Sequence, residues 1–293
     1  MRNSSILLIG ASGFIGGNLY KELHQHFKVI GTYNKTFRND LMKFDLETDD
    51  ISPLLQQFDL TCQNFAIITT AISKIDECFS NQVYSYKINV EKTKELIEKL
   101  NANNFKVIFL STDFVFDGRD GNYDEVSKQS PITEYGRQKT IIEEKIFEYN
   151  SLNVVVRLSK TVSNDLKAGN IFFDWLKSIK ENKDIVCIKD QEFVPTDVAD
   201  VSKAIVKIIE NDLSGIYNIV GDTSFSRLDL ANLFCQKGNI KQIKILEKEL
   251  QLFHFLDNRS LNTTLVNFKI KQDANMIFKS MDILLEEFWN NVV

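Results

Sequence analysis

The sequence of 293 residues is poor in proline and histidine, with three of each, and its four cysteines include no CxxC pair. Scattered cysteines without such pairs predict reduced thiols in a cytosolic protein rather than a disulfide framework. The histidines offer no metal-ligand spacing, so we expect no metal site. The cysteines are Cys62, Cys78, Cys187 and Cys235, and the histidines are His24, His26 and His254.

The chain also lacks a basic excess and a long apolar run. Its formal net charge of -5 and its isoelectric point near 5.4 argue against a nucleic-acid binder, which would show a basic face. The apolar segments are strand-sized, far short of the ~20 residues that cross a bilayer. The first of them, Ile6–Ile9, enters a glycine turn and therefore predicts a strand, not a signal peptide. We expect a cytoplasmic protein that binds neither nucleic acid nor membrane.

The first half of the chain alternates short apolar runs with longer amphipathic stretches. Such alternation predicts βαβ units and a parallel sheet covered by helices on both faces. The fold class is therefore α/β, with a doubly wound parallel sheet. The expected strands are Ile6–Ile9, Lys28–Thr32, Phe65–Ile68, Lys106–Leu110 and Asn153–Leu158, and the expected helices are Phe14–His26, Asn81–Asn101 and Glu134–Tyr149.

The pattern loosens after about residue 160. The run GIYNIV, Gly215–Val220, predicts a strand that rejoins the main sheet. We therefore expect a larger domain over residues 1–160, to which residues 182–220 partly return, and a smaller, interleaved C-terminal lobe over residues 161–293. In this second half, helices are expected at roughly 168–181, 197–212 and 226–237, and strands at 185–188 and 216–219.

The segment ILLIGASGFIGG places three glycines between the first strand and the helix after it. Gly10, Gly13 and Gly16 have GxxGxxG spacing, which differs by one residue from the GxGxxG fingerprint of dinucleotide sites. Glycines allow a tight turn and bring backbone amides close to a pyrophosphate at the positive end of the helix. The alternative is a turn that uses glycine for its shape alone. The motif predicts a Rossmann-type domain that binds a nicotinamide dinucleotide.

The second strand helps to choose the cofactor. NAD-selective sites place an acidic residue about 20 residues past the glycines, whereas Asn34 and Lys35 occupy that region here. Lys35 and Arg38 could pair with a 2′-phosphate, which favours NADP(H) over NAD(H), unless both are solvated loop charges. Asp45 either accepts a bond from the adenine amino group or caps a turn. Further cofactor contacts are expected from Ser12, Phe14, Ile15, Asn34, Leu46, Thr70 and Ala71.

Tyr135 and Lys139 lie four residues apart at the start of a predicted helix, and therefore on one face of it. A lysine ammonium beside a phenol would lower the pKa of Tyr135 toward neutrality and let it donate a proton to a carbonyl oxygen as hydride arrives at the carbon. Thr112 ends the fourth strand, at the edge where α/β sheets bind ligands, and its hydroxyl could hold the same oxygen. The three residues together predict carbonyl reduction; Tyr135 and Lys139 alone could be an exposed helix pair.

These motifs resemble those of the extended short-chain dehydrogenase/reductases. More narrowly, STDFVFDG, YGRQK and DQEFVPTDVADVSKAI are similar to the dTDP-4-dehydrorhamnose reductase family, whose patterns are close to STDYVFDG, YGxxK and DQxGxPT. AISKIDECFSNQVYSYKINV and DNRSLNT resemble further segments of that family, so the resemblance covers nearly the whole chain. It implies NADP(H)-dependent reduction of the 4-keto group of a nucleotide-linked deoxy sugar in carbohydrate or polysaccharide biosynthesis, with Thr112, Tyr135 and Lys139 as the catalytic residues.

The resemblance also implies contacts around this site. Asn89 would position the central segment near the cofactor, which Tyr135 and Lys139 would also contact. Arg259 would lie near the nucleotide diphosphate, unless it is a surface charge. The expected partner is a nucleotide sugar, and the assembly state stays open, with a homodimer as one alternative. The expected substrate-binding residues are Ser73, Asp113, Phe114, Gln191 and Arg259.

The chain departs from the family patterns at several positions. Lys160 stands where a sugar-contacting tryptophan is expected, Phe193 replaces the glycine of DQxGxPT, and no proline follows Arg259. These changes leave open which 4-keto sugar is reduced. A dehydratase would carry glutamate in place of Phe114, because eliminating water needs an added acid and base. A sugar-nucleotide 4-epimerase and a non-catalytic, NADP-binding regulatory subunit remain alternatives.

Overall fold

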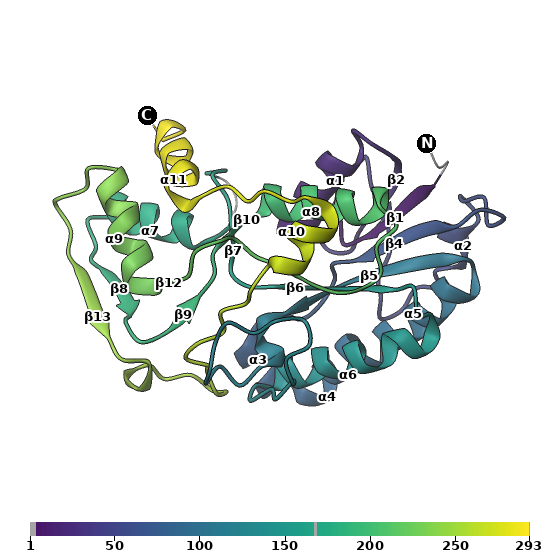
Figure 1. Cartoon of the computed structure of the whole chain (residues 1–293), viewed down its shortest axis with the longest axis horizontal. Coiled ribbons are helices and arrows are strands. Elements are labelled where there is room, and N and C mark those ends of the chain that lie inside the picture. The colour runs from purple at the N-terminus through teal and green to yellow at the C-terminus, as the bar shows by residue number, and fades with distance from the viewer. Residues whose placement is uncertain (1–3, 167–168, 293) are drawn as a thin grey trace.

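A parallel sheet of seven strands, in the order β11-β6-β5-β4-β1-β2-β3, forms the larger part of the molecule in the computed structural model, which describes residues 4–166 and 169–292 (Figure 1). All neighbouring strands in it run in parallel. The predicted doubly wound α/β fold is therefore confirmed. The strands are β1 (Ser5–Ile9), β2 (Lys28–Tyr33), β3 (Met42–Lys43), β4 (Asn64–Ile68), β5 (Phe105–Thr112), β6 (Val154–Leu158) and β11 (Gly215–Ile219).

Helices cover both faces of this sheet (Figure 1). Leu7 and Leu8, successive residues of β1, belong to apolar clusters on opposite faces, as alternation along a strand requires. This double burial explains why the strands are almost continuously apolar. One face is covered by α1 (Phe14–Leu23), α8 (Val198–Glu210) and α10 (Phe268–Ala274), and the other by α2 (Ser52–Leu55), α5 (Thr93–Ala102) and α6 (Glu134–Tyr149).

The helix predicted over Asn81–Asn101 consists of three consecutive segments. α4 (Gln82–Tyr86) leads into a π-helical stretch, η1 (Lys87–Lys92), which continues as α5. Periodicity in the sequence does not reveal such an insertion, and π-helical turns often lie at functional sites. Here the turn contains the buried side chain of Asn89. A short helix, α3 (Ile75–Ser80), precedes it.

A second lobe packs around its own apolar cluster, in which Phe172, Phe234 and Phe288 lie together. Its main helices are α7 (Ile171–Lys180), α9 (Arg227–Lys237) and α11 (Met281–Asn290), and the predicted helix start at residue 168 lies outside the described residues. The lobe's strands and short helical turns are β7 (Thr161–Val162), β8 (Ile185–Ile188), β9 (Glu192–Phe193), β10 (Thr196–Asp197), β12 (Phe225–Ser226), β13 (Ile245–Lys248) and η3 (Leu250–Leu252). The chain enters this lobe after β6 and returns from it through α8, which packs on the main sheet, to β11, which pairs with β6. The domain boundary at residue 160 stays a prediction.

The order of the strands changes direction at β1, which lies between β2 and β4. Ligands of doubly wound sheets bind at such a switch point, beyond the carboxyl ends of the strands. β5 ends there in a short turn, η2 (Asp113–Val115). Within the described ranges, no helix combines the length and the apolar character needed to cross a membrane.

Candidate active site

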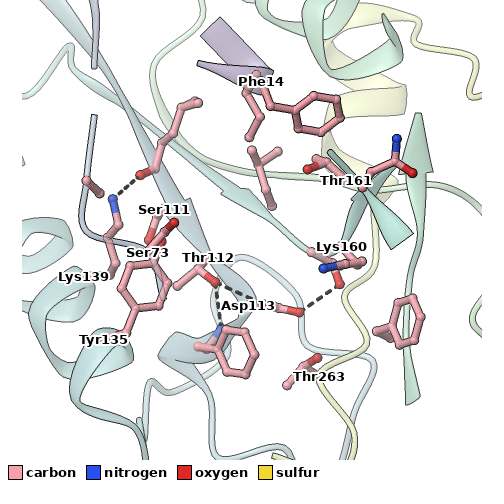
Figure 2. Close-up of a pocket in the computed structure, with 18 of the residues that line it drawn as sticks. Phe14, Ser73, Ser111, Thr112, Asp113, Tyr135, Lys139, Lys160, Thr161 and Thr263 are labelled. Atoms are coloured by element: carbon pink, nitrogen blue, oxygen red, sulfur yellow. Dashed lines mark hydrogen bonds between the residues drawn. The ribbon is translucent and has the colours of Figure 1, made fainter. Parts of the chain in front are cut away.

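Two adjoining cavities open at the carboxyl ends of the strands. One, of about 510 Å³, follows the turn between β1 and α1. The other, of about 370 Å³, lies between the ends of β5 and β6 and the second lobe (Figure 2). We call them the turn cavity and the strand-end cavity. They share six lining residues, which are Phe14, Ile15, Thr69, Ala71, Ser73 and Thr161.

The glycine turn leaves no room for a side chain at its closest contact. A Cβ on Gly16 would lie 2.1 Å from the carbonyl oxygen of Gly10, and Gly10 itself has a φ of +91°. α1 follows at once, with no acidic side chain in its first turn. Its free amides and positive end therefore suit an anion. The turn fits the pyrophosphate of a dinucleotide, and the predicted residues that line it are Gly10, Ser12, Gly13, Phe14, Ile15 and Gly16.

Of the two predicted cations, Lys35 lines the turn cavity, whereas Arg38 is not among its described lining residues. Four other predicted residues also line this cavity, Asn34, Leu46, Thr70 and Ala71. Arg38 lies beside the start of α1, where its Nη1 donates to the carbonyl oxygen of Ala11 at 3.4 Å and its Nη2 pairs with Asp40 at 2.6 Å. A 2′-phosphate would therefore compete with Asp40 for Arg38.

Asp45, predicted either to contact adenine or to cap a turn, is a capping residue in this structure. Its Oδ1 accepts the backbone N–H of Glu47 at 3.0 Å. It is not among the described residues that line the turn cavity. Its contact with a cofactor stays a prediction.

Asn89 is 3% exposed and lines neither cavity. Its Oδ1 accepts the backbone N–H of Ile72 at 2.8 Å, and its Nδ2 donates to the Ile72 carbonyl at 2.9 Å and to Oε1 of Gln138 at 2.7 Å. Gln138 lies on α6, next to Lys139. Asn89 thus ties the segment after β4, which lines both cavities at Ala71 and Ser73, to the helix that carries Lys139.

Thr112, Tyr135 and Lys139 all line the strand-end cavity (Figure 2). The close packing of α6 against the turn after β5 brings them together, because a Cβ on Gly136 would lie 2.1 Å from the carbonyl oxygen of Phe114. Thr133 caps the helix by accepting the backbone N–H of Gly136 at 2.9 Å. The glycine of the YGRQK motif is therefore required for this contact.

Burial dominates the electrostatics of Tyr135 and Lys139. It lowers the pKa of Lys139 to about 8 and raises the pKa of Tyr135 above its usual value. The predicted lowering of the Tyr135 pKa is therefore wrong in this structure. Lys139 directs its ammonium to the carbonyl oxygen of Leu110 at 2.7 Å, and its Nζ is 5.8 Å from the centroid of the Tyr135 ring. Desolvation of the phenolate outweighs a cation at that distance.

Asp113 is almost fully buried in the wall of the strand-end cavity. Its carboxylate accepts the hydroxyl of Thr112 at 3.0 Å and that of Ser159 at 2.8 Å, and Thr263 adds a third hydroxyl. Burial raises the pKa of Asp113, and these hydroxyl donors oppose the rise. Residues from three distant segments thus meet at this one carboxylate.

The other predicted substrate residues divide into two groups. Ser73, Phe114 and Gln191 line the strand-end cavity with Asp113. Arg259 is not among its described lining residues: its Nη2 pairs with Oδ1 of Asp76 at 2.8 Å, and its guanidinium lies 4.3 Å from the centroid of the Phe255 ring. A diphosphate contact by Arg259 stays a prediction and would have to compete with Asp76.

Eight polar residues of this cavity were not predicted as site residues: Thr69, Ser111, Ser159, Lys160, Thr161, Asn170, Arg227 and Thr263. Lys160 had a signal, since it replaces an expected tryptophan, and Thr263 ends the DNRSLNT segment. Nothing in the sequence around Arg227 indicated the site. In the described ranges, no group of three or more His, Cys, Asp or Glu side chains could hold a metal ion.

A family model described as the RmlD substrate binding domain matches residues 4–292. The dTDP-4-dehydrorhamnose reductase of Aggregatibacter actinomycetemcomitans is 26% identical over 234 residues, covering 77% of this chain and 76% of the relative. The methionine adenosyltransferase 2 subunit beta of Rattus norvegicus is 24% identical over 250 residues, covering 80% and 72%.

Among solved structures, the dTDP-4-dehydrorhamnose reductase of Bacillus anthracis in complex with NADP superimposes with a TM-score of 0.85. It is 24% identical, and the match covers 99% of this chain and 100% of that one. This likeness supports the fold.

Proposed function

The chain belongs to the family of the RmlD substrate binding domain, which confirms the predicted resemblance, and from this premise we propose that it is an NADP(H)-dependent reductase of a nucleotide-linked 4-keto sugar. One observation carries the proposal: Thr112, Tyr135 and Lys139 line the strand-end cavity, which adjoins the turn cavity. Carbonyl reduction needs a proton donor beside a site for a hydride-carrying cofactor. A relative named dTDP-4-dehydrorhamnose reductase supports the sugar class.

The cofactor has a fitting site in the turn cavity. Gly10, Gly16 and the first amides of α1 would hold its pyrophosphate. Lys35 and Arg38 would pair with the 2′-phosphate, which favours NADP(H). When bound, the nicotinamide supplies the hydride.

The residues of the strand-end cavity would supply the proton. Burial holds the pKa of Tyr135 high, so its phenol keeps the proton at neutral pH and donates it to the carbonyl oxygen. The ammonium of Lys139, whose pKa is about 8, is mostly charged at pH 7 and stabilises the phenolate left behind. Thr112 would hold the same carbonyl oxygen through its hydroxyl.

The test is NADPH oxidation, followed by absorbance, with a panel of dTDP- and UDP-linked 4-keto sugars that includes 6-deoxy and acidic members. We expect turnover with at least one sugar and a loss of 10²-fold or more in Tyr135→Phe. Tyr149→Phe, at the other end of α6, is the matched control and should leave turnover unchanged. Absence of turnover across the panel, or full activity in Tyr135→Phe, would refute the proposal.

A non-catalytic subunit is the second candidate, because the methionine adenosyltransferase 2 subunit beta matches 80% of this chain. It predicts that no sugar of the panel is reduced and that a protein partner copurifies with the chain. In that case Tyr135→Phe would leave binding of the partner unchanged. Turnover in the panel would exclude this candidate as the sole function.

A further inference from the structure

Two cations in the strand-end cavity have no ion-pair partner in the described part of the chain. Lys160 follows the end of β6, and Arg227 is the first residue of α9. Both line the cavity, and Figure 2 shows Lys160 beside Asp113. The Nε of Arg227 is buried without a hydrogen-bond partner.

Arg227 is half-buried and Lys160 is exposed to solvent, but a buried guanidinium nitrogen without a partner is costly, since buried polar groups are normally hydrogen-bonded. Desolvation lowers the pKa of both groups, and Arg227 lowers that of Lys160 further. Other buried cations of this protein have partners: Lys106 pairs with Asp212 at 3.0 Å, Arg157 pairs with Glu143 at 2.8 Å, and Lys139 donates to the Leu110 carbonyl oxygen at 2.7 Å. The unpartnered Nε of Arg227, in the cavity that Lys160 also lines, indicates a site for an anion that the chain itself does not provide.

The position of Lys160 indicates which part of a nucleotide sugar carries that anion. Leu158 lies opposite Thr112 in the β5–β6 register, and Lys160 is two residues further on. Asp113, next to Thr112, is near enough to raise the pKa of Lys160. In the proposed function, Thr112 holds the oxygen on C4 of the sugar. Substituents on C3 and C5 lie next to C4, whereas the diphosphate is attached to C1, across the ring.

We propose that Lys160 and Arg227 bind an acidic substituent of the sugar beside its reacting carbon, so that the substrate is an acidic nucleotide sugar, such as a 4-keto uronate. This inference rests on the proposed 4-keto reduction. It replaces the neutral methyl group of a 6-deoxy sugar by a carboxylate, which matches the departure of Lys160 from the family pattern.

The test measures binding and needs no turnover. Isothermal titration of the NADP⁺-bound protein would compare the glucose and glucuronate derivatives of UDP and dTDP with the two free nucleotides. We expect about tenfold tighter binding of glucuronate than of glucose in at least one nucleotide series, as for a charge-assisted hydrogen bond. Lys160→Met and Arg227→Met should each remove this preference while leaving the free nucleotide unaffected.

Arg119→Met is the control, since the Arg119 side chain is 83% exposed and distant in sequence from both segments. Thermal unfolding provides a second readout: removing an unpaired cation should not lower the unfolding temperature, whereas loss of a structural contact would. If Lys160→Met and Arg227→Met bound all ligands more weakly, including the free nucleotide, the two cations would be assigned to the diphosphate and the inference would be overturned. The inference would also be overturned if the wild type showed no preference for the glucuronate derivatives, or bound none of the ligands.

The outcomes separate this inference from the proposed function. A glucuronate preference that depends on Lys160 and Arg227, with no NADPH oxidation for any sugar of the panel, would refute the reductase but leave an acidic-sugar site. Turnover of a neutral 4-keto sugar without any preference for glucuronate would support the reductase and refute the acidic substituent.

Discussion

The hydroxyl of Thr112 donates to Oδ1 of Asp113 at 3.0 Å. The hydroxyl oxygen of Thr112 itself accepts the backbone N–H of Phe114 at 3.3 Å. In this structure the Thr112 proton is therefore directed to a carboxylate and not into the cavity. To hold a carbonyl oxygen as proposed, the hydroxyl must turn away from Asp113, whose carboxylate would keep the hydroxyls of Ser159 and Thr263.

Thr112→Val tests this role of the hydroxyl. We expect kcat to fall by about 10²-fold, the usual effect of removing one donor to a developing oxyanion. Thr112→Ser keeps the hydroxyl and should retain most of the activity. Steady-state kinetics with the substrate found in the panel would decide. Equal activity of the valine and serine variants would show that another group holds the oxygen.

Lys139→Met tests the buried ammonium through the pH dependence of stability. The pKa of Lys139 is lowered from 10.5 to about 8, so between these pH values the unfolded chain binds more protons than the folded one. The free energy of unfolding should therefore rise with pH in this window. Relative to Lys139→Met, the wild type should gain on the order of 3 kcal/mol between pH 7 and pH 11, measured by urea unfolding.

The control for this measurement is Lys145→Met, on the same helix. A hydrogen bond to Glu148 raises the pKa of Lys145. The contribution of Lys145 to the free energy of unfolding therefore has the opposite sign, and it declines as this lysine loses its proton at high pH. A difference between wild type and Lys139→Met that stays constant with pH would contradict the lowered pKa.

Gly136→Ala tests the contact that places Tyr135. The new Cβ would lie 2.1 Å from the Phe114 carbonyl oxygen, so the start of α6 must shift. We expect a loss of about 1–3 kcal/mol in unfolding free energy and a fall in kcat. Gly17→Ala is the matched control, because the nearest atom to its Cβ is 3.6 Å away and alanine favours a helix by up to about 1 kcal/mol. Equal stability of the two variants would contradict the contact.

Lys35→Ala and Arg38→Ala test the choice of cofactor. Each substitution should weaken the binding of NADPH more than that of NADH, by about tenfold, because only NADPH carries the 2′-phosphate. Asp40→Asn should strengthen the binding of NADPH, since Asp40 pairs with Arg38 at 2.6 Å and its carboxylate repels a phosphate. Dissociation constants from nicotinamide fluorescence would show this. Equal losses for both cofactors would refute the phosphate contact.

The sequence by itself was sufficient for the elements that depend on local patterns. Apolar periodicity located β1 and α6, and the glycine spacing located the turn between β1 and α1, because side chains near in sequence produce these features. The YxxxK spacing put Tyr135 and Lys139 on one helical face for the same reason. The π-helical turn around Asn89 was not predicted, since an inserted residue leaves no periodic signal in the sequence.

Only the tertiary structure decided the features that join distant segments. Thr263 reaches Asp113 and Arg227 reaches the strand-end cavity because the second lobe packs against the sheet edge, a placement that no local pattern encodes. The ion pair between Arg259 and Asp76 likewise joins residues 183 positions apart. The pKa of Tyr135 follows the same rule: the sequence placed a cation nearby and predicted a lowered value, but burial, which the whole fold creates, raises it.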